Sequence, residues 1–124
     1  KLRAQHFFDE NARVLAAKEA ILHHQTEAFL DAIRGSEASS ETLLANTMPP
    51  GIYQNSPQQA IYYQNPAIQG GACRIMGGGF AGSILCFTLK EQTPAFRDHM
   101  EKGYGASNVH PVAILPTGPT IVQD

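Results

Sequence analysis

A glycine-rich segment near the middle of the chain constrains the fold more than any other feature. Four glycines and the intervening Phe80 and Ala81 separate two short apolar stretches, residues 70–76 and 83–89. Glycine tolerates positive φ and admits other groups close to the backbone, so this pattern predicts a strand, a tight turn and a second strand. The turn is then either a plain hairpin connection or a backbone cradle for a ligand, and the residues alone leave both interpretations open.

Two known glycine motifs can be tested against this segment. The spacing Gly77-x-Gly79-x-x-Gly82 matches the dinucleotide-binding fingerprint in form. That fingerprint requires a helix directly after the glycines, whereas residues 83–89 are short, β-branched and aromatic, which is typical of a strand. The glycine loop of protein kinases does lie between strands, but this chain of 124 residues has no His-Arg-Asp or Asp-Phe-Gly sequence. Neither a Rossmann site nor a protein-kinase site is predicted.

The first third of the chain has the apolar spacing of helices. One helix is predicted over residues 2–23, with a single apolar stripe formed by Ala4, Phe7, Phe8, Val14, Leu15, Ile21 and Leu22. Thr26 is a candidate N-cap for a second helix, and Gly35 is its expected end. The chain starts without methionine and already in helical rhythm, so we expect it to be part of a longer protein.

Further helix and strand signals follow residue 55. Serine or threonine before proline is a strong helix start, since the hydroxyl caps the N-terminus and proline fits the first helical position. This rule predicts helices after Ser56-Pro57 and Thr93-Pro94, and closing strands are predicted at residues 109–115 and 120–122. With the two strands around the glycines, the order predicts an α+β fold: an antiparallel sheet with helices packed on one face.

Charge and cysteine content narrow the possible partners and location. The net charge of −2, with scattered lysines and arginines, offers no basic patch for nucleic acid, and no apolar run approaches the roughly 20 residues that span a membrane. Cys73 and Cys86 flank the glycines, so a hairpin would bring them together and a disulfide is conceivable. Buried free thiols in a reducing compartment are the commoner outcome, and we therefore expect a cytoplasmic protein.

Candidate catalytic and metal-binding groups are few. His6 and Glu10 have the i, i+4 spacing of shared metal ligands, but no third ligand follows, so a helix-surface ion pair is the better interpretation. Neither cysteine has a neighbouring base, and no Gly-x-Ser-x-Gly or Gly-x-x-x-x-Gly-Lys-Ser/Thr sequence occurs. The residues themselves indicate no catalytic set and no metal site, and they leave the glycine loop as the candidate ligand site.

Two separated stretches carry a family resemblance. Residues 3–14 read Arg-Ala-Gln-His-Phe-Phe-Asp-Glu-Asn-Ala-Arg-Val, and residues 71–82 read Gly-Ala-Cys-Arg-Ile-Met-Gly-Gly-Gly-Phe-Ala-Gly. They resemble, in this order, the Arg-Ala-x-His-x-x-x-Glu-Asn-x-Arg-Val helix and the Gly-Ala-Arg-Met-Thr-Gly-(Ala/Gly)-Gly-Phe-Gly-Gly third motif in the carboxy-terminal part of galactokinases, which are GHMP-family small-molecule kinases. Met76, Ala81 and Ser83 depart from the family's usual threonine, glycine and cysteine.

The resemblance implies that residues 1–124 form a single domain with the ferredoxin-like fold of GHMP kinase carboxy-terminal domains. Its partner would be an amino-terminal domain of the same chain, which carries the catalytic groups and most contacts to ATP, Mg²⁺ and sugar. The full-length protein would transfer the γ-phosphoryl of ATP to galactose or a related sugar, giving the sugar 1-phosphate. The isolated segment would be inactive, and its uncovered interface would favour self-association.

The resemblance also assigns a site. Gly77, Gly78, Gly79, Phe80 and Gly82 would line the cleft between the two domains, beside the phosphates and the sugar, with Phe80 as a packing wedge. Bulky side chains there would displace substrate, so Gly79→Val is expected to reduce turnover far more than stability.

Two other functions stay open at this point: a kinase-like sensor that binds sugar and ATP without turnover, and a free-standing α+β binding module. ADP release by the full-length protein would distinguish a kinase from a sensor.

Overall fold

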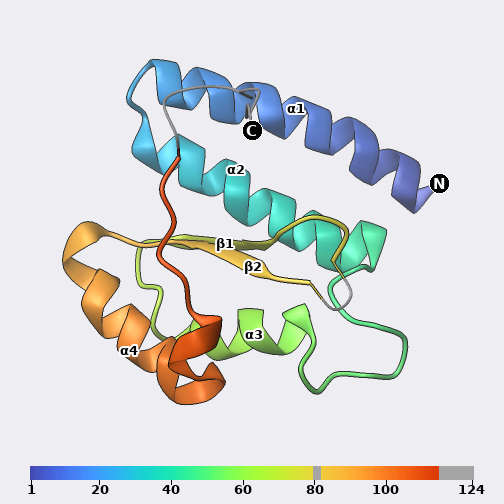
Figure 1. The fold of residues 1–124 in the computed structure, drawn as a ribbon. Coiled ribbons are helices and arrows are strands. Elements are labelled where there is room, and N and C mark those ends of the chain that lie inside the picture. Colours follow the sequence, from blue (N-terminus) through green and yellow to red (C-terminus); the bar gives the residue numbers. More distant parts are fainter. Residues whose placement is uncertain (80–81, 115–124) are drawn as a thin grey trace, which may run out of the picture.

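The computed structural model describes residues 1–79 and 82–114 and has the predicted α+β class (Figure 1). Within these residues it contains four α-helices and a two-stranded sheet, in the order α1 (Leu2–Leu22), α2 (Thr26–Ser39), α3 (Pro57–Gln64), β1 (Ala72–Ile75), β2 (Ile84–Phe87) and α4 (Thr93–Tyr104). A π-helical turn, Ser40–Leu44, continues α2, and short 3₁₀ turns, Lys90–Gln92 and Ala106–Asn108, flank α4.

The sheet is the antiparallel hairpin that the sequence predicts around the glycines. Its register pairs Cys73 with Cys86 and Ile75 with Ile84. Beyond the strands the amide of Met76 donates to the carbonyl of Ser83 at 2.8 Å, so the pairing continues to the edge of the turn. Both strands are four residues long, shorter than the predicted stretches.

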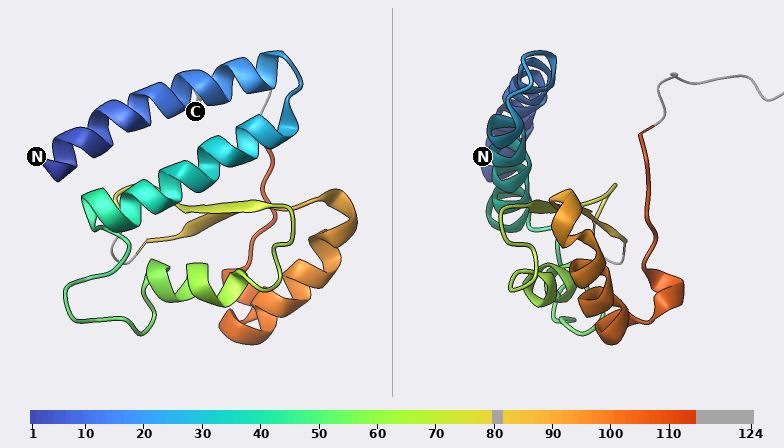
Figure 2. Two further views of the ribbon diagram at one scale, coloured as in Figure 1. Left: turned by 180° about the vertical axis from the view of Figure 1, so that it is seen from behind. Right: turned by 90° about the vertical axis from the view of Figure 1, so that its left-hand side faces the viewer.

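Helices lie on both sides of this sheet, so the prediction of helices on one face was wrong. Helices α1 and α2 lie on one side, and α3 and α4 on the other (Figures 1 and 2). The reason is that β1 carries buried residues on both of its faces. Cys73 and Ile75 belong to the cluster with α3 and α4, whereas Ala72 is buried on the opposite face. Successive side chains of a strand point to opposite faces, and two buried faces need two layers.

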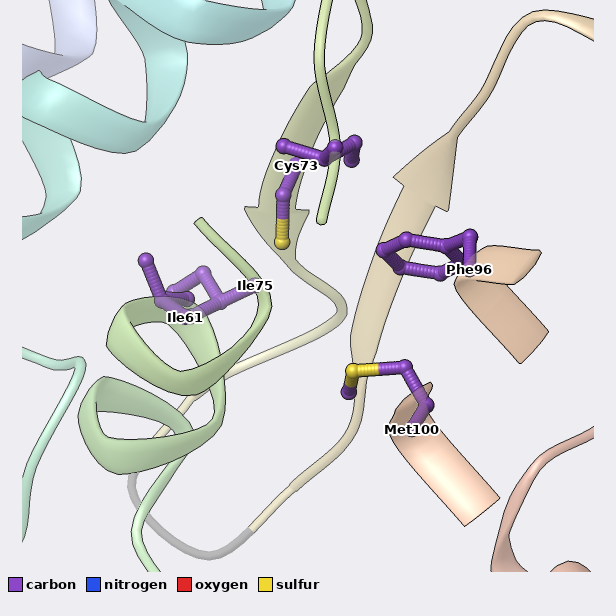
Figure 3. Packing of buried hydrophobic residues seen from close by; sticks show 6 residues of the cluster. Ile61, Cys73, Ile75, Phe96 and Met100 are labelled. Atoms are coloured by element: carbon purple, nitrogen blue, oxygen red, sulfur yellow. The ribbon is translucent and has the colours of Figure 1, made fainter. Parts of the chain in front are cut away.

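The core lies between the hairpin, α3 and α4. Its buried members come from three elements and one loop: Ile61, Ile68, Cys73, Ile75, Phe96 and Met100. Figure 3 shows the labelled side chains of β1, α3 and α4 directed toward one another. Burial of apolar surface stabilises the folded state by about 25 cal/mol for each Å² removed from water. This burial is the main stabilisation of such a small sheet.

Helix starts follow the predicted rule closely at α3 and less closely at α4. The Ser56 hydroxyl accepts a hydrogen bond from the Gln59 amide at 3.2 Å, which confirms it as the N-cap, and Pro57 begins the helix. Helix α4 does begin at Thr93, but the Thr93 hydroxyl donates to the Leu89 carbonyl instead of capping. Gly105, at φ +84°, follows its last residue as expected for a helix end.

Two sequence predictions of element ends were wrong. Helix α2 runs through Gly35 to Ser39, and Gly35 serves close helix packing instead of a helix end: a Cβ there would lie 3.1 Å from Nε of Arg13 in α1. Residues 109–114 form no strand; Pro111 lacks an amide donor, and Val112 and Ile114 are exposed. Residue 115 and the predicted strand at 120–122 lie outside the described residues.

Helix α1 turns its apolar stripe away from the other described elements. Ala20 is buried against α2, whereas the large apolar residues of the stripe are exposed, for example Phe8 at 68% and Leu15 at 64%. In Figure 1, α1 forms the outer layer, with α2 between it and the sheet. Among the described residues, no helix is both long enough and apolar enough to cross a membrane.

Candidate functional site

The glycine turn joins β1 to β2 and has the backbone geometry that needs glycine at two positions. Gly77 and Gly79 have φ of +69° and +79°, in the region that L side chains rarely adopt. The amide of Gly82 donates to the carbonyl of Gly79 at 3.1 Å, which closes the turn on itself. Phe80 and Ala81 lie outside the described residues, so the predicted role of Phe80 stays a prediction.

One side of the turn is held by Asn46, from the segment that follows α2. Its Nδ2 donates to the carbonyl of Gly78 at 3.0 Å. The backbone of Asn46 also lies against Gly79, where a Cβ would come within 2.1 Å of the Asn46 carbonyl oxygen. Real Cβ atoms do not approach a carbonyl oxygen so closely, so the fold itself requires glycine at position 79.

The segment that carries Asn46 is in turn fixed by two helices. The amide of Ala45, a residue at φ +57°, donates to the carbonyl of Ser40 at the end of α2. On the other side, the Thr47 carbonyl accepts from the Gln58 amide of α3 at 2.8 Å, and the Thr47 hydroxyl donates to the Gln58 side chain. The glycine turn is therefore tied to α2 and α3 through three buried residues, Asn46, Thr47 and Gln58.

The other side of the turn is open. Around ideal Cβ positions at Gly77 and Gly78, no atom of the described residues lies within 4 Å. Gly78 has neither a left-handed φ nor a steric neighbour in the part of the chain that the structure describes. The packing does not explain glycine at this position, whereas a ligand that approaches the backbone closely would.

This geometry changes the expected effect of Gly79→Val. The resemblance predicts that this substitution acts on the substrate cleft, but the Asn46 carbonyl would obstruct any side chain at position 79. Gly79→Val would therefore lower the stability of the fold as well as turnover. Gly78 is the position where the two effects can be separated.

Two side chains of α2 bind the backbone of β1. The Ile75 amide donates to Glu37 Oε2 at 2.9 Å, and the Gly71 carbonyl accepts from Arg34 Nε and Nη2 at 3.1 and 2.9 Å. The pairing of Met76 with Ser83 directs even-numbered backbone groups toward β2, so Gly71 and Ile75 point to the outer edge. Helix α2 thus closes this edge with polar side chains in place of a third strand.

Glu37 is the most strongly buried carboxylate of this arrangement. Burial raises the pKa of Glu37, and the nearby Glu41 adds to this; the Ile75 amide and the Arg74 charge act against it without cancelling it. Its Oε1 atom has no hydrogen-bond partner among the described residues. A carboxylate in such a place destabilises the fold when it is ionised.

Residues of the first motif hold α1 on α2. His6 Nδ1 lies 2.9 Å from the Ser39 hydroxyl, and Glu10 accepts from the Ser36 hydroxyl. Glu10 also pairs with Arg13 at 3.1 Å and with Arg74 of β1 at 3.5 Å. The predicted ion pair between His6 and Glu10 was therefore wrong: both side chains turn inward, each to a different serine of α2.

The structure also shows how the candidate metal ligands and the two cysteines are arranged. Within the described ranges, no three His, Cys, Asp or Glu side chains come together as a metal site. Cys73 and Cys86 face each other across the hairpin as free thiols; Cys73 is buried, as expected, whereas Cys86 is only half-buried.

Sequence reasoning missed Asn46 and Gln58. Asn46 lies 32 positions before the Gly78 carbonyl that it binds, and no periodicity or motif around it indicates that partner. The only local signal is negative: Pro49, Pro50 and Gly51 exclude regular structure there. A long loop between two helices is a candidate support for a neighbouring turn. The sequence of the loop does not indicate which turn it contacts.

Fold and site together define an α+β chain that presents a glycine turn on a two-stranded hairpin, with no described atom close to Gly77 and Gly78 on one side of the turn. Comparison with known proteins finds that galactokinases are similar to this chain. A galactokinase from Actinobacillus pleuropneumoniae is 32% identical over 107 residues, which cover 83% of this chain and 27% of that protein. Galactokinases from Glaesserella parasuis serovar 5 and Actinobacillus succinogenes are 30% and 28% identical, each over 102 residues that cover 82% of this chain and 25% of those proteins.

The resemblance to galactokinases that the two motifs predicted is confirmed: over the matched region the chain is similar to these proteins. It spans about a quarter of the length of the curated relatives it matches. No protein-family model matches the chain. No solved structure matches it either, so the fold stands as α+β without a structural neighbour.

Proposed function

We propose that this chain is the carboxy-terminal domain of a galactokinase-like sugar 1-kinase and supplies the glycine turn to the cleft between two domains. The full-length protein would transfer the γ-phosphoryl of ATP to galactose or a related sugar. The domain would correspond to the ferredoxin-like GHMP carboxy-terminal domain, with its described sheet limited to two strands. The isolated chain would not phosphorylate sugar.

The observation that carries the proposal is the open face at Gly78. The backbone there is held from behind by Asn46, yet the described packing leaves the front of Gly77 and Gly78 free. Phosphoryl transfer depends mainly on alignment and on charge stabilisation, and both need a surface that does not move. A turn tied to two helices, with no described side chain close to Gly77 and Gly78, suits a group that must approach the backbone.

ATP and Mg²⁺ would supply the phosphoryl group and its charge neutralisation. Around ideal Cβ positions at Gly77 and Gly78 no atom of the described residues lies within 4 Å, which suits the approach of a phosphate or sugar. In keeping with the resemblance to galactokinases, we assign most contacts to ATP and Mg²⁺ to the amino-terminal domain. The role of Gly77, Gly78, Gly79, Phe80 and Gly82 is to shape and position the remaining wall of the cleft.

The exposed face of α1 supports a further domain as partner. Six large apolar residues recur in pairs every seven positions and are all more than half exposed, namely Phe7, Phe8, Val14, Leu15, Ile21 and Leu22. A contiguous apolar face of this kind marks an interaction surface. We assign it to the remaining part of the full-length chain, since the curated relatives are about four times as long as the matched region.

The first experiment measures ADP release from ATP by the full-length protein, with galactose and with other hexoses. Release that depends on galactose supports the proposal, and release with another sugar alone reassigns the substrate. Binding of sugar and ATP without ADP release would indicate the sensor. A protein that binds neither would contradict both functions and leave the binding module.

The second experiment tests the turn. We expect Gly78→Val to lower turnover about 10- to 100-fold, because a misplaced reacting group has an effect of this size. Its unfolding midpoint should stay unchanged, because the described packing leaves space for the side chain. Ser107→Val, a matched change at an exposed position on the short turn after α4, should leave turnover unaffected. Normal turnover of Gly78→Val would remove the turn from the cleft.

A further inference from the structure

We propose that Cys73 and Cys86 are a modification site: on exposure to a low-molecular-weight disulfide they form an intramolecular disulfide that bridges the two arms of the glycine hairpin. This inference rests on the geometry of the hairpin and not on the proposed kinase function. It applies equally if the chain is a sensor or a binding module.

The hairpin places the two sulfur atoms close together. Cys73 and Cys86 are register partners in the sheet, and their Sγ atoms lie 3.5 Å apart, with the Cys86 thiol donating to Cys73. Because Met76 and Ser83 form a hydrogen-bonded pair, the alternation along the ladder makes Cys73 and Cys86 a non-hydrogen-bonded pair. At such pairs the Cα atoms are about 4.5 Å apart, within the range of about 4.4–6.8 Å that a disulfide spans. The backbone therefore needs little movement to accept the bond.

The two thiols differ in their exposure to solvent. Cys73 is 6% exposed and belongs to the core cluster, whereas Cys86 is half-buried and packs on the edge of that cluster. The hydrogen bond from Cys86 and the surrounding burial both raise the pKa of Cys73, which keeps it protonated. Cys86 is thus the thiol that meets a reagent first, and Cys73 is the resolving thiol.

The reaction balances as two thiol–disulfide exchanges. The Cys86 thiolate attacks one sulfur of the reagent RSSR, the reagent's S–S bond breaks, and RS⁻ leaves a mixed disulfide on Cys86. Cys73 then loses its proton and attacks the Cys86 sulfur, the mixed disulfide breaks, and a second RS⁻ leaves. The two thiol protons of the protein end on two molecules of RSH, and the reagent is reduced by the two electrons that the cysteines lose.

The bridge would lie three residues before Met76, where the turn begins. It would join the two arms covalently in addition to the ladder between them. The turn would then be held by Asn46 from behind and by the bridge at its base. Opening of the hairpin would be suppressed in the oxidised protein and allowed in the reduced one.

The test uses the position of Arg74 between the two cysteines. The full-length protein is equilibrated with oxidised glutathione, its remaining thiols are blocked with N-ethylmaleimide, and it is unfolded and digested with trypsin without reduction. Cleavage after Arg34, Arg74 and Lys90 places Cys73 in peptide 35–74 and Cys86 in peptide 75–90. We expect a disulfide-linked pair of these peptides, lighter by two hydrogens than their sum and abolished by dithiothreitol.

Single variants test the order of the steps. In Cys73→Ala the second exchange is impossible, so peptide 75–90 should carry glutathione. In Cys86→Ala the buried Cys73 should escape the reagent and carry N-ethylmaleimide after unfolding. If the wild-type peptides both carry N-ethylmaleimide, or both carry glutathione without a linked pair, the proposal is wrong. The wild-type result decides this even if a variant fails to fold.

Discussion

Gly79 is the residue of the turn on which the fold depends most directly. Its φ of +79° and the nearby Asn46 carbonyl both exclude a side chain. We expect Gly79→Ala to lower the free energy of unfolding by about 2 kcal/mol, in the range of left-handed strain and steric displacement. Urea denaturation followed by circular dichroism measures this change.

Gly78→Ala is the matched control in the same turn. It adds the same methyl group where no described atom lies within 4 Å, so its unfolding free energy should change by less than about 0.5 kcal/mol. Equal losses in the two variants would mean that the Asn46 contact does not constrain the turn.

Glu37 makes stability depend on pH in a direction opposite to that of a salt-bridged carboxylate. Burial raises its folded-state pKa above the usual value of 4.5, so the folded chain holds the proton more tightly than the unfolded chain. Its contribution to stability is therefore complete below the unfolded-state pKa and is lost as pH rises through the folded-state pKa.

We expect Glu37→Gln to remove this decline. An amide oxygen can still accept the Ile75 hydrogen bond, while the buried charge disappears, so the variant should gain about 1 kcal/mol at neutral pH. Unfolding free energies measured from about pH 4 to about pH 8 test the sign. The exposed Glu91→Gln serves as control, and parallel pH curves for wild type and Glu37→Gln would contradict the argument.

Helix α3 depends on a single cap that the sequence predicted and the structure confirms. Ser56 accepts from the Gln59 amide and donates to the Tyr53 carbonyl, so its hydroxyl connects the helix to the loop before it. We expect Ser56→Ala to lower the free energy of unfolding by about 1 kcal/mol. Ser107→Ala, at an exposed position, should be neutral in the same thermal or urea experiment.

The cap also matters for the turn. Gln58, in the first turn of α3, binds Thr47 beside Asn46, so fraying of the helix would release the support behind the glycines. Hydrogen exchange should then show faster exchange in residues 45–47 and in the turn of Ser56→Ala. Unchanged exchange there, with the expected loss of stability, would mean that the support does not run through α3.

Helix α1 presents an apolar face that nothing in the described structure covers. If the remaining part of the full-length chain covers it, the isolated chain should pair through this face instead. We expect isolated residues 1–124 to self-associate in sedimentation velocity, and Phe8→Glu with Leu15→Glu to shift the chain toward monomer. Ala16→Glu adds a charge on another face of α1 and should leave association unchanged.

A monomeric wild-type chain would contradict this expectation. So would an equal effect of Ala16→Glu, because charge alone and not the apolar face would then control association. The full-length protein provides the converse measurement: its α1 face should be protected from hydrogen exchange where the isolated chain is not.

Local features of the sequence were enough for the helices, the hairpin and the family. The apolar spacing of residues 2–23, the Ser56-Pro57 start and the glycines between two strands act over a few positions, and each appears in the structure where it was expected. The two motifs that indicated galactokinases are local as well, and the comparisons bear them out. The assignment of the glycines to a cleft is still a prediction.

Long-range packing decided the rest. Three findings depend on which elements meet. Gly35 lies inside α2, and helices cover both sides of the sheet (Figure 1). Helix α1 directs His6 and Glu10 inward and Phe8 outward. Asn46 behind Gly79 is separated from it by 33 positions, and Cys73 and Cys86 approach only when the hairpin forms. Local patterns record what a residue prefers in its own segment, whereas these contacts arise between segments whose relative placement has no signal within either one.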